Sequence, residues 1–155
     1  MFRLALSFLA LGLVALAVPF PTSANEERTR VDTRIFLGNK PAPCYEASVP
    51  NCGQTVPVHS VVHDKARVSS YGPPPTGTVT FAFFNDLDCR GNPVLIEVVP
   101  VQLTNSPTVS IANSSSNGPL EPGDYSYRAL YNPDAAAQAS GLGDVPGDCE
   151  QLRVK

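Results

Sequence analysis

Proline and glycine interrupt this chain so often that they leave little room for a helix. The 155 residues include 16 Pro and 11 Gly, and residues 72–77 form a Gly-Pro-Pro-Pro-Thr-Gly cluster. No helix could cross that cluster, because proline lacks the backbone donor that a helix needs and clashes with the preceding turn. The sequence therefore favours short extended segments joined by turns.

Between these interruptions, apolar and polar residues alternate with the period of two that a half-buried strand requires. The clearest case is 78–84, in which Val79, Phe81 and Phe83 alternate with Thr and Ala. Residues 125–131 repeat the pattern with three tyrosines on one face. Such runs predict about seven strands: 33–37, 60–68, 78–84, 94–103, 108–112, 125–131 and 149–154.

Three polar or helix-breaking residues complicate this pattern. Asp64 shares the parity of the apolar residues in 60–68, so we expect a bulge there or a strand that begins after Asp64. Pro100 predicts an edge strand or a bulge within 94–103. Asp134 could cap a helix, but glycines follow closely, so we expect one helical turn at most. Short strands without an amphipathic helix predict a single all-β domain, an antiparallel β-sandwich.

Residues 1–24 have the pattern of a secretory signal peptide: Arg3, an apolar run over 4–18, and small residues up to Ala24. The alternative, an uncleaved membrane anchor, is disfavoured because a span needs about 20 apolar residues. We therefore expect a secreted, extracellular protein with no membrane span after cleavage. The charged residues 25–32 would form a loose N-terminal arm, and 33–155 would form the sandwich domain.

Charge and chemistry exclude several function classes. The formal net charge is −3, and loss of Arg3 with the signal would leave 10 Lys and Arg against 14 Asp and Glu, a charge of −4. From this net charge we expect no basic surface and no nucleic-acid partner. His59 and His63 would lie about 13 Å apart on a strand, too far apart to bind one metal ion. No Gly-x-Ser-x-Gly elbow is present, so we expect neither an enzyme nor a cofactor.

All four cysteines, Cys44, Cys52, Cys89 and Cys149, lie after the expected cleavage site. An even number in a secreted chain indicates two disulfides, and three pairings are possible. Cys44 and Cys52 could close a local loop. Cys89 and Cys149 would then close a loop of about sixty residues, worth roughly 4 kcal/mol in the chain-entropy model. A zinc site is disfavoured, because close Cys-x-x-Cys pairs are absent.

Six short motifs follow one another in a characteristic order and spacing. They are VVHDKARV at 61–68, PTGTVTF at 75–81, CRG at 89–91, LEPGDYSYRA at 120–129, YNPD at 131–134 and CE at 149–150. Over about residues 57–155 the chain resembles bacterial-type immunoglobulin-like repeats, modules of secreted and cell-surface proteins. The resemblance implies an immunoglobulin-like sandwich and a disulfide between Cys89 and Cys149. The chain departs from the family in having a single module and in the insert that carries Cys44 and Cys52.

The segment from Leu120 to Tyr125 also has a physical interpretation that is independent of the family. Its Pro and Gly form a tight turn. Tyr125 directly after the turn can bury its ring and hydrogen-bond its hydroxyl to nearby backbone, the tyrosine-corner arrangement. The alternative is a surface aromatic residue on a strand.

Two further groups of polar residues are candidate sites. Asp86 and Asp88 could offer oxygen ligands to Ca²⁺, together with Asp144 and Asp148 if Cys89 bonds to Cys149. A solvated turn explains them equally well, because Asn and Asp favour turns, so we expect no metal site. Asn113-Ser-Ser is a glycosylation sequon in the expected surface loop 113–118, and a plain polar loop is the alternative.

These features together predict a secreted, non-catalytic binding or adhesion module whose partner is an extracellular protein or polysaccharide. The loops 85–93 and 132–148 would form the contact surface, because a bond between Cys89 and Cys149 would tie them at one end. One alternative is a passive structural component of a wall or matrix. Another is a small secreted inhibitor or effector that acts through a constrained loop between Cys44 and Cys52.

Overall fold

The computed structural model describes residues 28–43 and 53–155, which fold into eleven strands and one short helix. Seven of these strands have five or more residues: β1 (Thr29–Leu37), β4 (Val62–Ser70), β5 (Gly77–Phe84), β6 (Leu95–Pro100), β8 (Val109–Asn113), β9 (Gly123–Pro133) and β11 (Glu150–Val154). The others have two or three residues: β2 (Lys40–Pro41), β3 (Gln54–Val56), β7 (Gln102–Leu103) and β10 (Val145–Pro146). The helix, α1, spans Ala135–Ala139.

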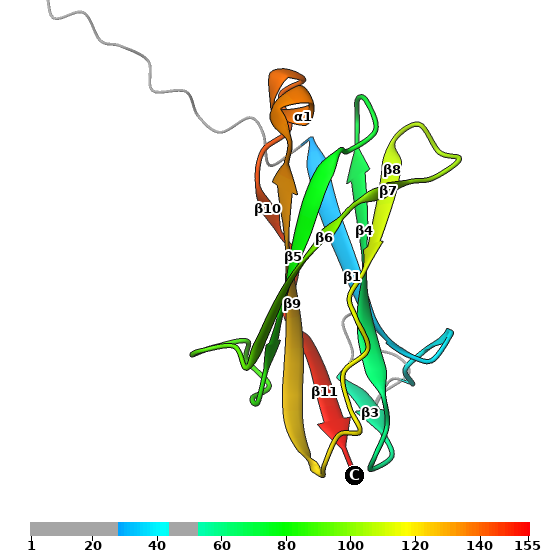
Figure 1. Ribbon diagram of the computed structural model, residues 1–155, viewed down its shortest axis with the longest axis vertical. Coiled ribbons are helices and arrows are strands. Elements are labelled where there is room, and N and C mark those ends of the chain that lie inside the picture. The colour runs from blue at the N-terminus through cyan, green and yellow to red at the C-terminus, as the bar shows by residue number, and fades with distance from the viewer. Residues whose placement is uncertain (1–27, 44–52) are drawn as a thin grey trace, which may run out of the picture.

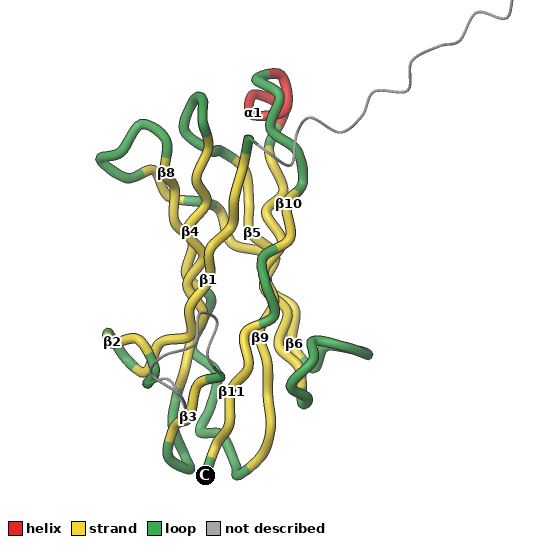
Figure 2. The backbone as a smooth tube through the Cα atoms, turned by 180° about the vertical axis from the view of Figure 1, so that it is seen from behind, coloured by secondary structure: helices red, strands yellow, loops and turns green. Residues whose placement is uncertain are grey.

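The strands form two sheets that pack face to face, so the predicted all-β sandwich is confirmed (Figures 1 and 2). A five-stranded sheet has the order β2-β1-β4-β8-β7. A six-stranded sheet has the order β3-β11-β9-β5-β6, and β10 pairs with β9. The pairs are antiparallel except β3 and β11, which run parallel.

The core lies between the sheets and consists of the inward-facing side chains of alternating residues. On β5, Val79, Phe81 and Phe83 are buried, as the alternation predicts. Tyr127 and Tyr131 of β9 face the same interior. Each large side chain that leaves water in this way stabilises the fold by about 1.5–3 kcal/mol.

The segment 95–103 closes one side of the sandwich, because it contributes an edge strand to each sheet. β6 is the edge strand of the six-stranded sheet, and β7, directly after it, is the edge strand of the five-stranded sheet. The crossing occurs at Val101, whose amide donates to the Gly77 carbonyl oxygen at 3.0 Å. Pro100 ends β6, so its missing N–H lies on an edge strand, as predicted.

The strand β1 begins earlier than expected, so the interpretation of 25–32 as a loose arm is wrong for residues 29–32. Thr29 and Val31 are buried and alternate with Arg30 and Asp32, which face outward. β1 pairs with β4 over nine positions, from Thr29 opposite Ser70 onward. Charged residues at alternate positions are compatible with a strand that is buried on one face only. Residues 1–27, including the expected signal peptide, lie outside the described part of the chain.

A disulfide joins Cys89, in the loop after β5, to Cys149, just before β11. The pairing that the resemblance implied is therefore confirmed. The Cys89 amide also donates to the Ser126 hydroxyl oxygen of β9 at 3.2 Å, which holds the loop against the six-stranded sheet. Cys44 and Cys52 lie outside the described residues, so their bond stays a prediction.

The helix α1 agrees with the expectation of a single helical turn. The Asp134 carboxylate caps it by accepting a hydrogen bond from the Ala137 amide at 2.9 Å. The same carboxylate accepts a hydrogen bond from the Thr76 hydroxyl at 2.8 Å, which ties the helix to the turn before β5.

Replacing both bonded cysteines, Cys89→Ala with Cys149→Ala, should lower the free energy of unfolding by about 4 kcal/mol. The reason is the separation of 60 residues between them, which the bond removes from the freedom of the unfolded chain. Urea titration of the oxidised wild type and the double variant, followed by circular dichroism, measures the difference. A loss within about 0.5 kcal/mol, the scale of an ordinary surface substitution, would contradict this account.

Candidate functional site

Alternating residues of β1 and β4 point outward from the five-stranded sheet and bring positive charges together. The antiparallel register places Arg34 beside Lys65, and Asp32 beside Arg67. We define the basic face by its cations, which are Arg30, Arg34, Lys65 and Arg67, and by three other outward side chains of the same strands: Asp32 among the cations, and Phe36 and His63 beyond them.

Positive charge is concentrated on this sheet although the chain as a whole is negative. The strands β1, β2, β4, β7 and β8 contain five Lys and Arg but only two acidic residues, Asp32 and the buried Asp64. Other acidic residues lie in the loops after β5 and β9, at Asp86, Asp88, Asp134, Asp144 and Asp148. The expectation that this chain has no basic surface is therefore wrong, because net charge sums over both faces of the molecule. That no nucleic acid binds stays a prediction.

The Asp32 carboxylate forms ion pairs with two of the cations, Arg30 and Arg67. Its carboxylate oxygens lie 2.6 Å from Arg30 Nη2 and 3.6 Å from Arg67 Nη1. All three side chains are partly exposed, so water and salt weaken these ion pairs. The geometry holds the two guanidinium groups on either side of one carboxylate, where both keep donors available to a ligand.

An aromatic pair lies at the other end of the basic face. The Phe36 ring stacks on the His63 ring with 5.5 Å between centroids, and Lys65 Nζ lies 5.7 Å from the Phe36 centroid. Burial, and then the Lys65 charge, lower the pKa of His63. The imidazole is therefore neutral at pH 7 and forms a flat, uncharged surface with Phe36.

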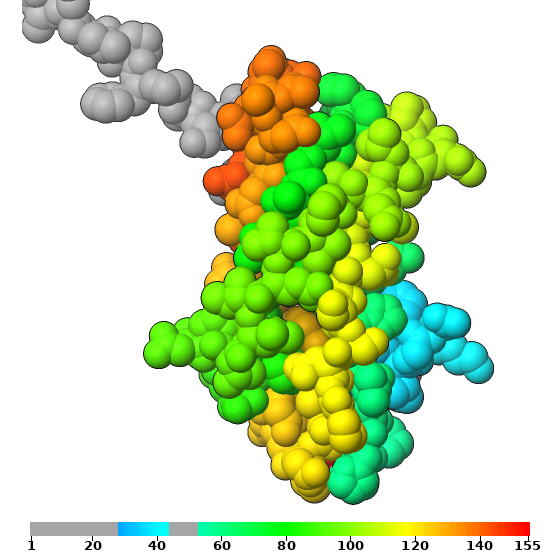
Figure 3. All heavy atoms as spheres, viewed as in Figure 1, coloured from blue at the N-terminus to red at the C-terminus, as the bar shows by residue number. Residues whose placement is uncertain are grey.

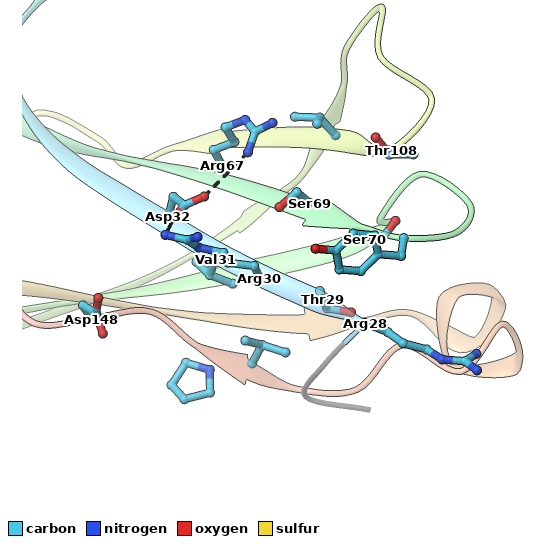
Figure 4. A pocket seen from close by; sticks show the side chains of 14 residues that line it. Arg28, Thr29, Arg30, Val31, Asp32, Arg67, Ser69, Ser70, Thr108 and Asp148 are labelled. Carbon is cyan, nitrogen blue, oxygen red and sulfur yellow. Dashed lines mark ion pairs between the residues drawn. The ribbon is translucent and has the colours of Figure 1, made fainter. Parts of the chain in front are cut away.

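The basic face continues into an open cavity of about 790 Å³ around the start of β1 (Figure 4). Arg30 and Arg67 belong to both the face and the cavity, and Arg28, Ser69, Tyr71 and Thr108 also line it. Figure 4 shows β1 running between Arg67 and Ser69 on one side and Asp148 on the other. A second cavity of about 370 Å³ shares Arg28 and Tyr71 with the first.

The lining of these cavities is suited to binding. Guanidinium groups and hydroxyls donate hydrogen bonds to oxygen-rich anions such as carboxylate and sulfate. The larger cavity is lined by Asp, Ser, Thr and Tyr as well as Arg, and neither of the two cavities is lined by His, Cys, Lys or Glu. Tyr71 is 92% exposed beside the arginines, and its ring is free to pack against a ligand.

A pair of carboxyl groups lies inside the sandwich, behind the basic face. Asp64 is completely buried within an unbroken β4, so the expected bulge or later strand start is wrong. Burial and the nearby Glu150 raise the pKa of Asp64 well above its usual value. The amides of Lys65 and Arg34 oppose this shift, but neither makes a hydrogen bond of ordinary geometry with the carboxyl. The uncharged form that burial favours allows Asp64 to occupy a core position.

Glu150, at the start of β11, completes this pair. Burial raises the pKa of Glu150 to about 7, while Thr33, the Ile35 amide and Arg34 oppose the increase. Burial also raises the pKa of Tyr127, and Asn117 and Ser114 oppose this increase, although neither makes a hydrogen bond of ordinary geometry with the hydroxyl. Neither cavity is lined by Asp64 or Glu150, so the pair has no route to a substrate through them.

The structure places Tyr125 where the sequence analysis suggested a corner. Its hydroxyl donates to the Glu121 carbonyl oxygen at 3.0 Å, across the turn before β9. Its ring stacks on Phe83 with 5.4 Å between centroids. The residue therefore joins the turn to the edge of the core.

Asn113, the sequon residue, is exposed and is the last residue of β8, so the strand extends one position into the expected loop 113–118. The sequon's Ser115 is bonded to β6: its hydroxyl donates to Glu97 Oε1 and its amide to Glu97 Oε2, each at 2.7 Å. This contact connects the end of β8 in one sheet to β6 in the other.

The acidic and histidine candidates are dispersed. Asp86 Oδ1 accepts hydrogen bonds from the Asp88 amide at 2.8 Å and the Arg90 amide at 3.3 Å, as in a turn. His59 precedes β4 and lies 3.7 Å from Glu121, while His63 is within β4. No group of three or more His, Cys, Asp or Glu suited to a metal ion occurs among residues 28–43 and 53–155.

The loops 85–93 and 132–148 begin at opposite ends of the sandwich, and their role as a contact surface stays a prediction. β5 pairs with β9 so that Gly77 lies opposite Pro133 and Phe84 lies opposite Ser126. The two loops therefore leave the ladder at opposite ends, about 24 Å apart. The disulfide joins only the last part of the second loop to the first.

Comparison with known proteins adds no family: no family model matches this chain, and no curated protein matches it. The resemblance to bacterial-type immunoglobulin-like repeats therefore stays a prediction. In the described part of the chain, no helix is long and apolar enough to cross a membrane.

The sequence analysis missed the basic face, although the sequence contains a signal for it. Arg30 and Arg34 share one parity on β1, and Lys65 and Arg67 share one parity on β4. Two strands with cations at alternate positions form a positive face if they are neighbours in the sheet. To predict the basic face, one must know that β1 pairs with β4, and the alternation of residues within each strand does not specify that pairing.

The buried carboxyl pair should make stability fall as pH rises. Between about pH 4.5, the ordinary pKa of a glutamate, and about 7, the raised pKa of Glu150, the folded chain holds more protons than the unfolded chain. Glu150 should therefore lower the free energy of unfolding by up to about 1.4 kcal/mol per pH unit within this window, and Asp64, whose pKa is also raised, should add a decrease in the same direction.

Urea titrations from pH 4.5 to pH 8 measure this slope. Glu150→Gln should flatten it, while Asp88→Asn in an exposed loop should leave it unchanged. The lowered pKa of His63 makes stability rise with pH, opposite to the effect of the carboxyl groups. His63 is present in every variant, so its contribution cancels when the slopes of two variants are compared. Equal slopes in the wild type and Glu150→Gln would show that Glu150 does not produce the pH dependence.

Proposed function

We propose that this protein is a secreted, non-catalytic binding module whose contact surface is the basic face together with the cavity beside it. The ligand carries negative charge. The observation that carries the proposal is the concentration of Arg30, Arg34, Lys65 and Arg67 on two paired strands of a chain whose net charge is −3.

The scaffold supports this function because strands hold side chains more rigidly than loops do. The two strands are joined over nine register positions, so the spacing of the cations is set by the sheet. A preorganised surface loses little conformational entropy when it binds. The arginines of the face are exposed, so their charged ends can reach a ligand without rearrangement of the sheet.

The two alternative functions have less support in the described residues. A passive wall or matrix component needs no separation of charge between its faces. An inhibitor or effector that acts through the loop between Cys44 and Cys52 depends on residues outside the described part. Adhesion to a charged surface is compatible with the proposed binding function.

Retention on a sulfonate cation-exchange resin at pH 7 tests the proposal. We expect the secreted form of the full chain to bind at low salt despite its negative net charge, because the basic face presents its cations together. Neutralising two of them, Arg34→Gln with Lys65→Gln, should weaken binding on the order of tenfold and lower the eluting salt concentration. Asp32→Asn should raise it, because this change frees two guanidinium groups.

The matched control is Arg90→Gln with Arg128→Gln, which removes the same charge from a loop and from the outer face of the other sheet. We expect this control to elute close to the wild type. Equal shifts for both double variants, or no retention of the wild type, would overturn the proposal. Circular dichroism spectra establish that each variant is folded.

A further inference from the structure

Aromatic rings lie at both ends of the basic face. Phe36, stacked on His63, is at one end, and the exposed Tyr71 is in the cavity at the other end. Tyr71 is eight residues after His63 along β4 and the turn that follows it, so the rings are about 26 Å apart. The cations Arg34, Lys65, Arg67 and Arg30 lie between them.

Cations in a row with an aromatic ring at each end indicate the chemical class of the ligand. This inference rests on the proposed function. We infer that the protein binds an acidic polysaccharide, a chain of sugars that carries carboxylate or sulfate groups. The chain lies along β1 and β4, from Phe36 to the cavity at Tyr71.

The positions of the cations fit an extended ligand with repeated charges. Lys65 and Arg67 are two residues apart on one strand, about 7 Å, and the neighbouring strand lies about 5 Å away. The Arg groups can bind carboxylate or sulfate through two parallel hydrogen bonds, and Lys65 acts as a point charge. Each anionic group along the polysaccharide therefore meets a cation in turn.

The rings fit the sugars themselves. A sugar ring has a face of C–H groups that packs against an aromatic ring, while its hydroxyls stay hydrated. Tyr71 is 92% exposed, so little reorganisation is needed before it makes this contact. Ser69 and Thr108 line the same cavity, and their hydroxyls can hydrogen-bond to sugar hydroxyls.

Other polyanions fit less well. The centre of a protein interface is depleted in Lys and Asp, whereas Lys65 and Asp32 lie at the centre of this face. Single-stranded nucleic acid stacks successive bases on neighbouring rings, and here the rings are at opposite ends of the face. A membrane surface would gain most from protruding apolar side chains between the cations, but Asp32 occupies that place.

Fluorescence anisotropy with labelled polygalacturonate, labelled dextran sulfate and neutral labelled dextran tests the inference at 0.1 M salt. We expect saturable binding of at least one charged polysaccharide and at least tenfold weaker binding of dextran. Tyr71→Ala should weaken that binding about fivefold, and Tyr71→Phe should restore it. Ile96→Ala is the control, because it truncates an exposed apolar residue on the other sheet.

The outcomes separate this inference from the proposed function. Retention on the sulfonate resin tests the proposed function alone, because the resin carries charge but no sugar rings. If Arg34→Gln with Lys65→Gln lowers retention but neither charged polysaccharide binds, or Tyr71→Ala has no effect on binding, the inference is wrong while the proposed function stands. Equal or tighter binding of single-stranded DNA or of phosphatidylserine vesicles would likewise overturn it. If the charge variants leave retention unchanged, the proposed function itself fails.

Discussion

The antiparallel ladder between β1 and β4 is the interaction on which the rest of this structure depends. Its nine paired positions decide which side chain of each strand faces the core and which faces water. A shift by one residue would bury the cations and expose Val31, Val68 and Ile35, so the burial of apolar residues selects one register. That register places Arg34 beside Lys65 and Asp32 beside Arg67, and thereby creates the basic face. Figure 3 shows the molecule's surface from the edge where β6 crosses in front of the two sheets.

The same ladder explains why Asp64 does not cancel the charge of the face on the other side of its strand. Buried in the core beside Glu150, Asp64 favours its uncharged form, as the raised pKa indicates. An ionised carboxylate there would reduce the positive potential of Lys65 and Arg67. The core position of Asp64 therefore costs stability at higher pH, and Asp32 is the one acidic side chain among those that define the basic face.

Alternation of apolar residues predicted the parts of the fold in which burial on one face decides the structure. The seven longer strands, the tyrosine face of β9 and the turn capped by Asp134 all follow from local pattern. Two- and three-residue strands such as β2 and β7 are too short for alternation, and only their neighbours define them. Strand pairing was the missing information. Without it, the basic face, the strand character of residues 29–32 and the opposite positions of the two long loops could not be derived.

The bond between Cys89 and Cys149 also determines how this domain responds to mechanical tension. Cys149 directly precedes the last strand, so a force on the carboxyl end detaches only β11 before it reaches the covalent bond. The segment between the two cysteines, with a separation of 60 residues, then carries no load and cannot straighten. At about 3.4 Å per residue, the disulfide reduces the maximum extension of the stretched chain by roughly 200 Å. A molecule anchored at both ends would therefore lengthen far less than its sequence allows, even after both sheets had separated.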